Sequence, residues 1–412
     1  MVNQLPQGWK EEELGKLADV SSGDSAPQSS SYFLNGIYPF CRTSDVGKIH
    51  RSSNFSEIED YINETAISKL HLFRRGTILF PKSGASTLLN HRVMLSIDSY
   101  VSSHLATIYA NSIDRYYLYY FLCTVDAKQL VPNIDYPSLK ISELKNIKVP
   151  YPTDKGEQDY IVKTLDTVAE MIKLRKETIQ LTKDLIPAIF QEMFGDCSEN
   201  VLIGNNDYFE IEDGDRGNNY PKKEELLEKG DCLFLSAKNV TEDGFVFKEN
   251  VFISQDKDKK LRTGKLKRHD FVMMTRGTIG NIAYYAPDIP YDNIRINSGM
   301  VIIRIKQGFE PLYFLQAMRS DNVKFQINNL ITGAAVPQLP IHLIKKISLK
   351  LADNTKQKEF AEKVEQINDY IIAQQEELEQ FETLFQSLLQ EAFTGVLTWN
   401  YPRKECHDKK DK

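Results

Sequence analysis

The chain has 412 residues, which is too long for one compact core and fits two domains with connecting structure. Its composition, 41% hydrophobic and 26% charged, is typical of a globular protein, and no apolar run approaches the roughly 18 residues of a membrane helix. The five cysteines are scattered without a CxxC pair, and the first residues lack the pattern of a secretory signal. These features argue against a membrane protein, a disulfide-rich scaffold and a zinc site, and they predict a cytoplasmic protein.

The net charge of −6 argues at first against a nucleic-acid partner, but the charges are distributed unevenly. Residues 67–92 contain five Lys or Arg and no acid, and residues 257–276 contain eight against two acids. The acidic excess lies elsewhere, since residues 353–391 hold ten acids against three lysines. Because phosphate neutralisation is local, two basic segments on an acidic body are compatible with DNA contact. Two solvated basic faces are the alternative interpretation.

The first 150 residues predict a globular domain of mixed α/β character. Aromatic and β-branched residues are broken by Gly, Pro, Asn and Asp, and the apolar run GTILF (76–80) is typical of a strand. The segment YLYYFL (117–122) predicts a short helix. We therefore expect the first domain to cover residues 1–150.

A long helix is predicted next, within a helical region over residues 151–196. Residues 157–193 contain no Gly and a single Pro, and apolar residues recur there in steps of three and four over five heptads. Such a stripe predicts a coiled-coil helix about 55 Å long at 1.5 Å per residue. Arg175 interrupts the stripe at its midpoint.

The second half of the chain repeats this order with a period near 194–200 residues. A second globular domain is expected over 197–350, a second helical region over 351–397 and a charged tail over 398–412. The second heptad run covers 356–392, with Gln374 at its midpoint. The corresponding blocks are YPFCRTSDV with CLFLSAKNV, GTILFPKSGAS with HDFVMMTRGTI, RYYLYYFLCTV with EPLYFLQAMRS, YPSLKISELKNIKVP with VPQLPIHLIKKISLK, EQDYIV with KQKEFA, and IFQEMF with LLQEAF.

The two helices are expected to bury their apolar stripes against each other, because neither can cover its stripe alone. An antiparallel pair within one chain would leave the globular domains at opposite ends. In a pair aligned by its centres, Arg175 and Gln374 would face each other and form a polar contact that fixes the register. Packing of each stripe on its own globular domain is the alternative. The expected fold class is α+β, with two globular domains separated by two long antiparallel coiled-coil helices and an internal pseudo-twofold repeat.

Several segments carry a known family pattern: GWKEEELGKLADV (8–20), GTILFPKSG (76–84), residues 332–364 and QEAFTGVLTW (390–399). With the duplicated order of segments, they make residues 5–399 resemble the DNA-sequence-specificity (S) subunits of Type I restriction–modification systems. The resemblance implies two target recognition domains, each followed by a conserved helical region. It also implies that double-stranded DNA, two methylase (M) subunits and motor-nuclease (R) subunits are the partners, with no membrane involved.

The resemblance implies a non-catalytic subunit, and the residues agree. The chain has no GxxxxGK[ST] phosphate loop and no NPP[FY], DPPY or FxGxG of adenine methylases. Asp135 with Glu143 and Lys145 is the best nuclease candidate, since acids spaced before ExK can hold Mg²⁺. The second copy has Leu343 and Ile344 in place of Glu143 and Leu144. We expect no catalytic residue, metal or cofactor. A stand-alone Mg-dependent nuclease or methylase-associated enzyme, and a coiled-coil scaffold that does not bind DNA, remain the alternatives.

Side chains with fixed donors and acceptors would read base edges, whereas Lys82 and Lys238 would contact phosphate. Because the reading loops of the two domains differ, the target should be asymmetric and bipartite, with the helices setting the spacer. The alternative for each turn residue is that it satisfies only its own backbone. The expected DNA-binding residues of the first domain are Arg42, Thr43, Ser44, Arg74, Arg75, Lys82, Ser83, Arg92 and His104. Those of the second domain are Ser236, Lys238, Asn239, Arg276, Thr278, Asn281 and Arg295.

Overall fold

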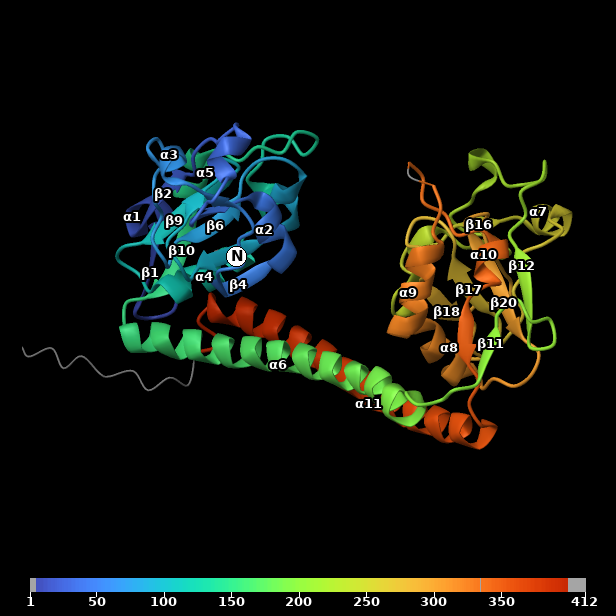
Figure 1. Cartoon of the computed structure of the whole chain (residues 1–412). Helices are drawn as coiled ribbons and strands as arrows, with labels where there is room; N and C mark the ends of the chain where they lie inside the picture. The colour runs from blue at the N-terminus through green and yellow to red at the C-terminus, as the bar shows by residue number, and fades with distance from the viewer. Residues whose placement is uncertain (1–4, 334, 399–412) are drawn as a thin grey trace, which may run out of the picture. The chain divides into compact units, whose positions relative to one another are not determined.

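The computed structural model describes residues 5–333 and 335–398, and the chain divides into two compact units (Figure 1). Unit 1 is Met1–Lys176 with Glu376–Lys412, and unit 2 is Glu177–Gln375. Two long helices, α6 (Lys155–Phe194) and α11 (Asn354–Ala392), are shared between the units. The first half of α6 and the second half of α11 belong to unit 1, and the other two halves belong to unit 2. The remaining elements are mixed strands and short helices, which confirms the α+β class.

Three sheets form the globular part of unit 1. Its strands are β1 (Trp9–Glu13), β2 (Ala18–Ser22), β3 (Tyr38–Cys41), β4 (Arg51–Phe55), β5 (Tyr61–Ile62), β6 (Ile78–Pro81), β7 (Arg92–Leu95), β8 (Tyr100–Val101), β9 (Leu105–Ala110) and β10 (Lys148–Pro152). They pair in the orders β2-β9-β6-β7-β4, β5-β3-β8 and β1-β10. Its short helices are α1 (Leu14–Leu17), α2 (Thr43–Ile49), α3 (Glu64–Ile67), α4 (Arg115–Thr124) and α5 (Ile141–Lys145), with 3-10 turns η1 (Ser30–Phe33), η2 (Ala85–Leu89) and η3 (Ala127–Gln129).

Unit 2 repeats this plan with one additional hairpin. Its strands are β11 (Asn200–Leu202), β12 (Phe209–Asp213), β13 (Cys232–Phe234), β14 (Val240–Thr241), β15 (Gly244–Phe245), β16 (Phe252–Ile253), β17 (Phe271–Met274), β18 (Ile282–Tyr284), β19 (Ile294–Arg295), β20 (Met300–Ile305) and β21 (Ser348–Lys350). They pair in the orders β12-β20-β17-β18, β16-β13-β19, β11-β21 and β14-β15. Its helices are α7 (Gln255–Lys260), α8 (Pro311–Arg319), α9 (Asp321–Leu330) and α10 (Ile341–Ile344), with η4 (Lys223–Glu225) and η5 (Ala237–Asn239).

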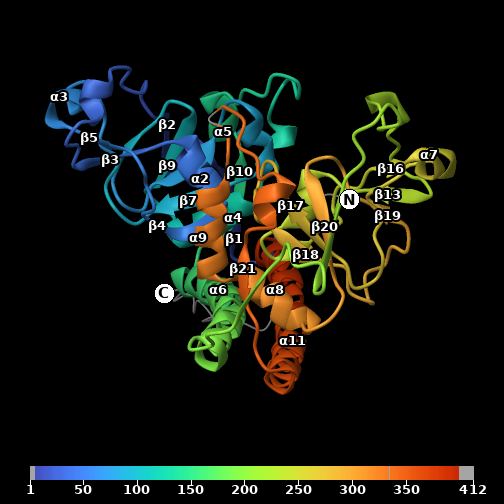
Figure 2. The ribbon, with the colours of Figure 1, turned by 45° about the vertical axis from the view of Figure 1, so that its right-hand side comes forward.

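The sheet orders show that the sequence repeat is a structural repeat. The central order β2-β9-β6-β7 corresponds to β12-β20-β17-β18, and β5-β3-β8 corresponds to β16-β13-β19. In both of the smaller sheets the middle strand pairs antiparallel with one neighbour and parallel with the other. Figure 2 shows that β3, β5 and α3 gather at one edge of unit 1, and that β13, β16, β19 and α7 lie together within unit 2.

Two buried hydrogen-bond networks recur at corresponding positions. Gln158 on α6 accepts from the backbone N–H of Asp114 and donates to the Pro152 carbonyl, at 3.1 and 2.9 Å. Gln357 on α11 accepts from the Glu310 N–H at 2.8 Å and donates to the carbonyl of Ala352 at 2.9 Å. Because Asp114 and Glu310 cap α4 and α8, each network connects a long helix to a capped helix of its globular part.

The tyrosines near the start of α4 and α8 form the second recurring contact. Tyr117 donates to the carbonyl of Pro150 at 2.7 Å, and Tyr313 donates to that of Lys350 at 3.0 Å. In the repeat, α4 therefore corresponds to α8, with Tyr117 matched to Tyr313. This match is shifted by one residue from the sequence alignment of 115–125 with 310–320. The strand and helix expected at 76–80 and 117–122 are β6 and α4.

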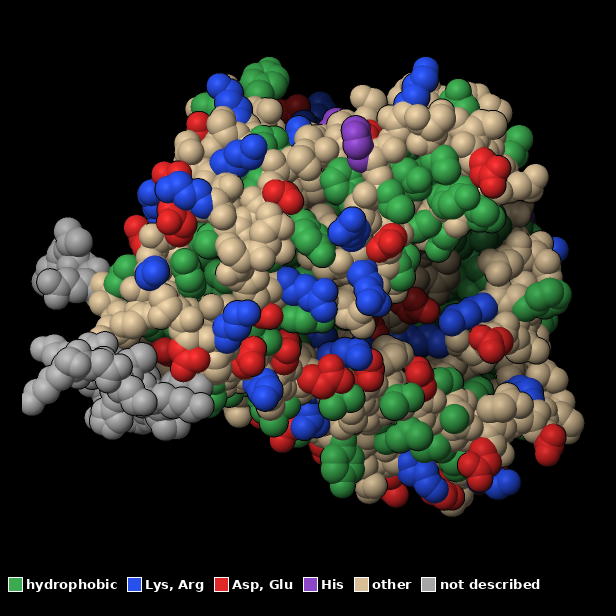
Figure 3. Space-filling view, turned by 90° about the vertical axis from the view of Figure 1, so that its left-hand side faces the viewer, with side chains coloured by type: hydrophobic (Ala, Val, Ile, Leu, Met, Phe, Trp, Pro, Cys, Tyr) green, Lys and Arg blue, Asp and Glu red, His purple; other side chains and the backbone are tan. Residues whose placement is uncertain are grey.

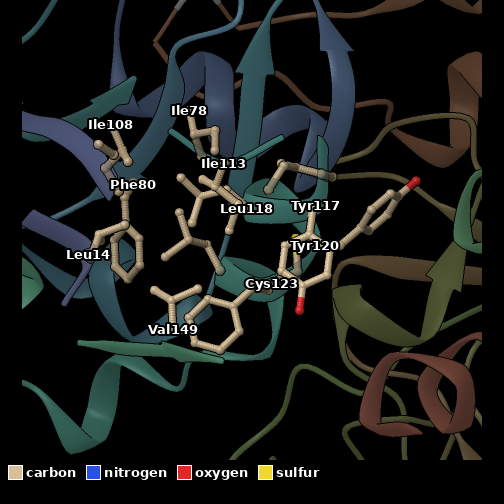
Figure 4. Packing of buried hydrophobic residues seen from close by; sticks show 14 of the residues in the cluster. Leu14, Ile78, Phe80, Ile108, Ile113, Tyr117, Leu118, Tyr120, Cys123 and Val149 are labelled. Atoms are coloured by element: carbon tan, nitrogen blue, oxygen red, sulfur yellow. The ribbon is translucent and has the colours of Figure 1, made fainter. Parts of the chain in front are cut away.

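The core of unit 1 lies between the central sheet, α4 and the first half of α6 (Figure 4). Ile78, Phe80 and Ile108 from the sheet meet Tyr117 and Leu118 from α4. These five side chains are inaccessible to solvent, and burying each stabilises the fold by about 1.5–3 kcal/mol. An equivalent cluster in unit 2 contains Phe271, Ile303, Tyr313, Phe314 and Phe360. The sheet, and the turns at its ends, are therefore held on a rigid base.

Within each unit the two long helices run antiparallel. In unit 1, Ile161 and Leu165 near the start of α6 share a core with Leu389 and Ala392 near the end of α11. In unit 2 the later part of α6 meets the start of α11, where the rings of Phe190 and Phe360 lie 5.6 Å apart. The pairing expected from the heptads is confirmed. The same cores also include residues of α4 and α8, so the alternative of packing on the globular part occurs alongside it.

The polar residues at the two helix midpoints each have a polar partner other than the one expected. Arg175 Nη2 pairs with the Glu377 carboxylate at 2.6 Å within unit 1. Gln374 Nε2 donates to the Thr182 hydroxyl at 3.3 Å within unit 2, and its buried Oε1 has no partner among the described residues. A role of Arg175 and Gln374 in fixing the register therefore stays a prediction.

Two further expectations concern membrane-spanning helices and the charged tail. No helix among the described residues is long and apolar enough to cross a membrane. The charged tail expected at 398–412 lies outside the described residues, apart from Thr398, which is buried.

Candidate nucleic-acid interface

The turn that follows β6 is fixed in unit 1 by two neighbouring loops. The N–H of Lys82 donates to the His104 carbonyl at 2.9 Å, and the Lys82 carbonyl accepts from the Leu139 N–H at 2.8 Å. Gly84 has a φ of 77°, a left-handed conformation that favours glycine, and it donates to the Pro137 carbonyl at 3.0 Å. The turn is therefore tied on one side to the β8–β9 loop and on the other to the loop before α5.

The turn after β17 has the same connections in unit 2. The N–H of Thr275 donates to the Gly299 carbonyl at 2.8 Å, and the Thr275 carbonyl accepts from the Leu339 N–H at 2.9 Å. Gly277 has a φ of 72°, like its counterpart in unit 1. Isolated bridges join Ser83 to Ser138 and Arg276 to Gln338. The alignment of Ser83 with Arg276 is thus a structural equivalence.

A set of loops converges at this end of the sheet in each unit, and we call it the loop edge. In unit 1 it consists of residues 42–44, 82–84, 102–104 and 133–138. The loop 102–104 connects the segment 42–44 to the turn 82–84. Its Ser102 donates its N–H to the carbonyl of Cys41, at the end of β3, at 2.9 Å, and its His104 carbonyl accepts from Lys82. Of the expected DNA-binding residues, the structure brings together Arg42, Thr43, Ser44, Lys82, Ser83 and His104.

The loop edge of unit 2 consists of residues 236–238, 276–278, 297–299, 332–333 and 335–338. The expected DNA-binding residues Ser236, Lys238, Arg276 and Thr278 lie on it. The side chain of Asn281, which is half-buried just beyond the turn, donates to the Val240 carbonyl at 3.4 Å.

Exposed apolar side chains stand at the tip of each loop edge. Tyr136 is 82% exposed in unit 1 and Val336 is 70% exposed in unit 2. The loops that carry them are aligned in the sequence repeat, yet neither residue was among the expected DNA contacts. The signal that could have found them is an aromatic or aliphatic residue next to a proline in a loop, where it has no core to join. Such side chains can contact the thymine methyl group or the faces of bases.

A cavity of about 300 Å³ opens at the loop edge of unit 2. Arg276 and Gln338 line it together with Asp213, Arg216 and His342. The Arg276 guanidinium donates to Gln338 Oε1 at 3.4 Å, a long bond that leaves most of its donors available. Side chains that can form hydrogen bonds, which recognition of a base edge requires, therefore line this cavity together with apolar residues.

Arg92 was expected to contact DNA, and the structure corrects this. Its side chain is 0% exposed and lies over the Phe80 ring, 3.1 Å from the ring centre. It donates to the carbonyls of His91 and Val125 at 2.7 and 3.2 Å. Burial lowers the pKa of its guanidinium. Arg92 is the first residue of β7 and is part of the interior of unit 1.

Arg295 and Asn239 also belong to the interior. Arg295 is 6% exposed, forms an ion pair with Asp258 and donates to the carbonyls of Leu261 and Thr263. Burial opposes ionisation of Asp258, but hydrogen bonds from Lys265 and Arg295 hold the pKa of this carboxyl below its usual value. Asn239 is 0% exposed and donates to the carbonyls of Val246 and Glu249. Neither side chain can reach DNA.

The two basic segments are not continuous basic surfaces. Arg74 and Arg75 are exposed but precede β6, whereas Lys82 follows it, so these cations lie at opposite ends of the strand. In the second segment Lys257, Lys265 and Arg268 form ion pairs with acids of their own unit. Figure 3 shows basic side chains interspersed with acidic ones on the face that it presents. The loop edges therefore carry few cations, among them Lys82 and Arg276.

The nuclease candidate shows no clustering of metal ligands. Asp135 is exposed in the loop before α5, and Glu143 and Lys145 are exposed on α5 itself. Among the described residues, no three His, Cys, Asp or Glu side chains gather in a way that could hold a metal ion.

Residues 6–183 match the family model described as the Type I restriction modification DNA specificity domain. Over 187 residues the chain is 30% identical to the Type I restriction enzyme MjaIX specificity subunit of Methanocaldococcus jannaschii. This alignment covers 44% of the chain and 42% of that relative, so the chain spans about two fifths of its length.

Solved structures match along nearly the whole chain. One, from work on complex assembly and conformational transition of the type I R-M system, has a TM-score of 0.59 at 15% identity and covers 95% of this chain and 99% of that one. The Type I restriction–modification S subunit from M. genitalium gives a TM-score of 0.49 at 16% identity, with 95% and 97% covered. The first of these shows a shared fold. Residues 6–183 are thus similar to the Type I restriction modification DNA specificity domain, and the 15%-identical structure is similar in fold alone.

Proposed function

We propose that the chain is the DNA-sequence-specificity subunit of a Type I restriction–modification enzyme and reads an asymmetric bipartite target. Each unit would contact one half-site through its loop edge, and the helices α6 and α11 would set the spacer. The chain would then consist of recognition domains at 1–150 and 197–350, helical regions at 151–196 and 351–397, and a charged tail at 398–412.

One observation carries this proposal: the two units share one framework but differ at the exposed turn that both frameworks present. Lys82, Ser83 and His104 in unit 1 correspond to Thr275, Arg276 and Gly299 in unit 2. Base sequence is read by side chains on groove edges, while backbone contacts fix the register. Two domains that share a strand order but carry different residues at the equivalent turn are suited to two different half-sites. The specificity-subunit name of the relative from M. jannaschii supports the same conclusion.

The proposed role is that of a non-catalytic scaffold with no cofactor, acting in the cytoplasm. Two methylase subunits and motor-nuclease subunits would dock on the chain and supply the chemistry. The lack of methylase and phosphate-loop motifs in the sequence supports this division of labour. Arg175 and Gln374 remain the proposed register-setting residues of the helices.

Enrichment from a randomised double-stranded DNA library tests the function. The full chain, purified with the methylase subunits of its own cells, should enrich two short conserved segments separated by a spacer of fixed length and unspecified sequence. A single palindromic site would contradict the two-reader proposal. Retention of DNA without any sequence preference would reduce the chain to a non-specific binder, and no salt-dependent retention would favour a scaffold that does not bind DNA.

A further inference from the structure

At the equivalent turns, the two units place a large side chain on different members of a pair of adjoining loops. In unit 1 the turn carries the small Ser83, and the adjoining residue of the other loop is His104, which lies opposite Lys82. In unit 2 the turn carries Arg276, and the adjoining residue is Gly299, which lies opposite Thr275. A Cβ built on Gly299 would lie 3.7 Å from Cβ of Arg276, so a side chain there would stand beside the base of the arginine. The two pairs are therefore complementary in size.

The hydrogen-bonding capacity at the two positions also differs. Ser83 Oγ and His104 Nδ1 are 2.6 Å apart, which holds the exposed imidazole in one orientation. Whichever of these two atoms donates, the ring has one further nitrogen, Nε2, for one hydrogen bond. Arg276 instead presents a planar fork of donors, and Gln338 engages only one nitrogen of that fork, at 3.4 Å. Such a fork matches O6 and N7 of guanine in the major groove.

Resting on the proposed function, we propose that these adjoining positions, 83 with 104 and 276 with 299, are a specificity-determining pair in each unit. Arg276 reads a guanine by two hydrogen bonds in the half-site of unit 2. His104, oriented by Ser83, makes one hydrogen bond to a base edge at the corresponding place in the half-site of unit 1. The small partner in each pair leaves room for the large one, so exchanging the pair between the units should exchange the preference.

The expected size of the effect follows from the number of bonds. A good bidentate contact discriminates against the wrong base by about 5- to 150-fold. A single hydrogen bond discriminates less, so the base in the half-site of unit 2 should be the more strictly specified of the two. Removal of Arg276 should relax the preference at one base pair and leave the other positions unchanged.

The test compares library enrichment by the wild-type chain with that by three variants, each in the complex with its methylase subunits. The first is Arg276→Ser with Gly299→His, and the second is Ser83→Arg with His104→Gly. The third, Arg276→Lys, keeps the charge but lacks the planar fork. Lys358→Gln, at an exposed position on α11, is the control for loss of a positive charge. Thermal unfolding of each variant verifies that the fold is retained, and Arg276→Ser alone replaces the first variant if Gly299→His unfolds it.

We expect the first variant to lose a guanine preference at one position of one half-site, and the third to show a weaker preference there. We expect the second variant to gain this preference in the other half-site. Equal weakening for all sequences would mean that Arg276 contacts phosphate, and it would overturn the inference. So would unchanged half-sites in every variant, provided that the wild-type chain enriches a bipartite site. If the wild-type chain enriches no sequence at all, the proposed function fails first, and the two failures are thereby distinguished.

Discussion

Unit 1 and unit 2 are the same framework with different surfaces. The residues that connect each globular part to its long helix recur with the same bonds, as Gln158 and Gln357 show. The residues that face solvent at the equivalent turns do not recur, as Ser83 and Arg276 show. Buried polar groups must be hydrogen-bonded, which restricts their replacement, whereas an exposed turn residue can change with little effect on stability. The difference between the units is thus concentrated where a ligand would be contacted.

The buried cations of the two units differ in a second way. Arg295 in unit 2 forms an ion pair with Asp258, which is itself 5% exposed. Arg92 in unit 1 has two carbonyls and the Phe80 ring as partners, and among the described residues it has no carboxylate partner and its Nε has no hydrogen-bond partner. Breaking a buried ion pair leaves an uncompensated charge, whereas removing an unpaired buried charge relieves a desolvation cost.

The largest expected effect sharpens this contrast. Arg295→Met should lower the free energy of unfolding by about 3 kcal/mol, because it leaves the buried Asp258 carboxylate with Lys265 alone. Arg92→Met should change it by less than about 1 kcal/mol, because the lost hydrogen bonds are offset by the relief of desolvation. Urea unfolding followed by hydrogen exchange within each unit measures both effects. Equal destabilisation by the two substitutions would show that the ion pair contributes nothing beyond packing.

A smaller effect separates the two ends of β6. Lys82→Ala, at the loop edge, should weaken DNA binding several-fold and flatten the dependence of affinity on log salt, because fewer counterions are released. Arg74→Ala with Arg75→Ala removes two charges from the other end of the strand and should leave the salt dependence unchanged. Fluorescence titrations over a range of salt concentrations measure both slopes. A larger loss from the double variant would place the DNA at the opposite end of the sheet.

The smallest effect concerns pH. Burial first, and then the neighbouring His50, Arg92 and Arg51, lower the pKa of His91 below its usual value of 6.5. When the pKa of a histidine is lower in the folded chain than in the unfolded chain, the folded state loses stability as the pH falls below the pKa of the unfolded chain. Unit 1 should therefore weaken between pH 7 and about 5.5, while the lowered pKa of Asp258 in unit 2 costs stability only at more acidic pH.

Hydrogen exchange of unit 1 at the two pH values provides the measurement, with His91→Gln as the matched variant. The substitution removes the titrating group and should abolish the difference between the two pH values. Persistence of the same pH dependence in His91→Gln would assign the effect to another group.

The sequence predicted the framework well because the framework is periodic and duplicated. The heptads of 157–193 lie within α6, and the aligned blocks around 76–86 and 269–279 became β6 and β17 with their turns. Periodicity of this kind arises because one face of a helix or strand is buried, and it can be detected in each segment of the sequence alone. The direct contact expected between Arg175 and Gln374 was beyond such reasoning, because it depends on the axial offset of the helices.

The candidate site was predicted less completely because exposure is not local in sequence. Arg92 and Arg295 are arginines in otherwise suitable segments, but the strands that carry them point them into the interior. Arg75 and Lys82 are close in the chain, yet β6 separates them. The pairing of Ser83 with His104 requires two strands to meet, and a linear sequence contains no signal for it. The repeat, which aligned Ser83 with Arg276, and the family pattern at 76–84 both pointed to this turn.

Exchange of one recognition domain tests the two-reader account most directly. Residues 10–150 are replaced by the equivalent segment of another specificity subunit with a known target, and the methylated sites in the host genome are mapped. Because each unit has its own core and its own loop edge, one half-site should change to that of the donor subunit while the other half-site stays the same. A simultaneous change of both half-sites in a folded chimera would contradict the account.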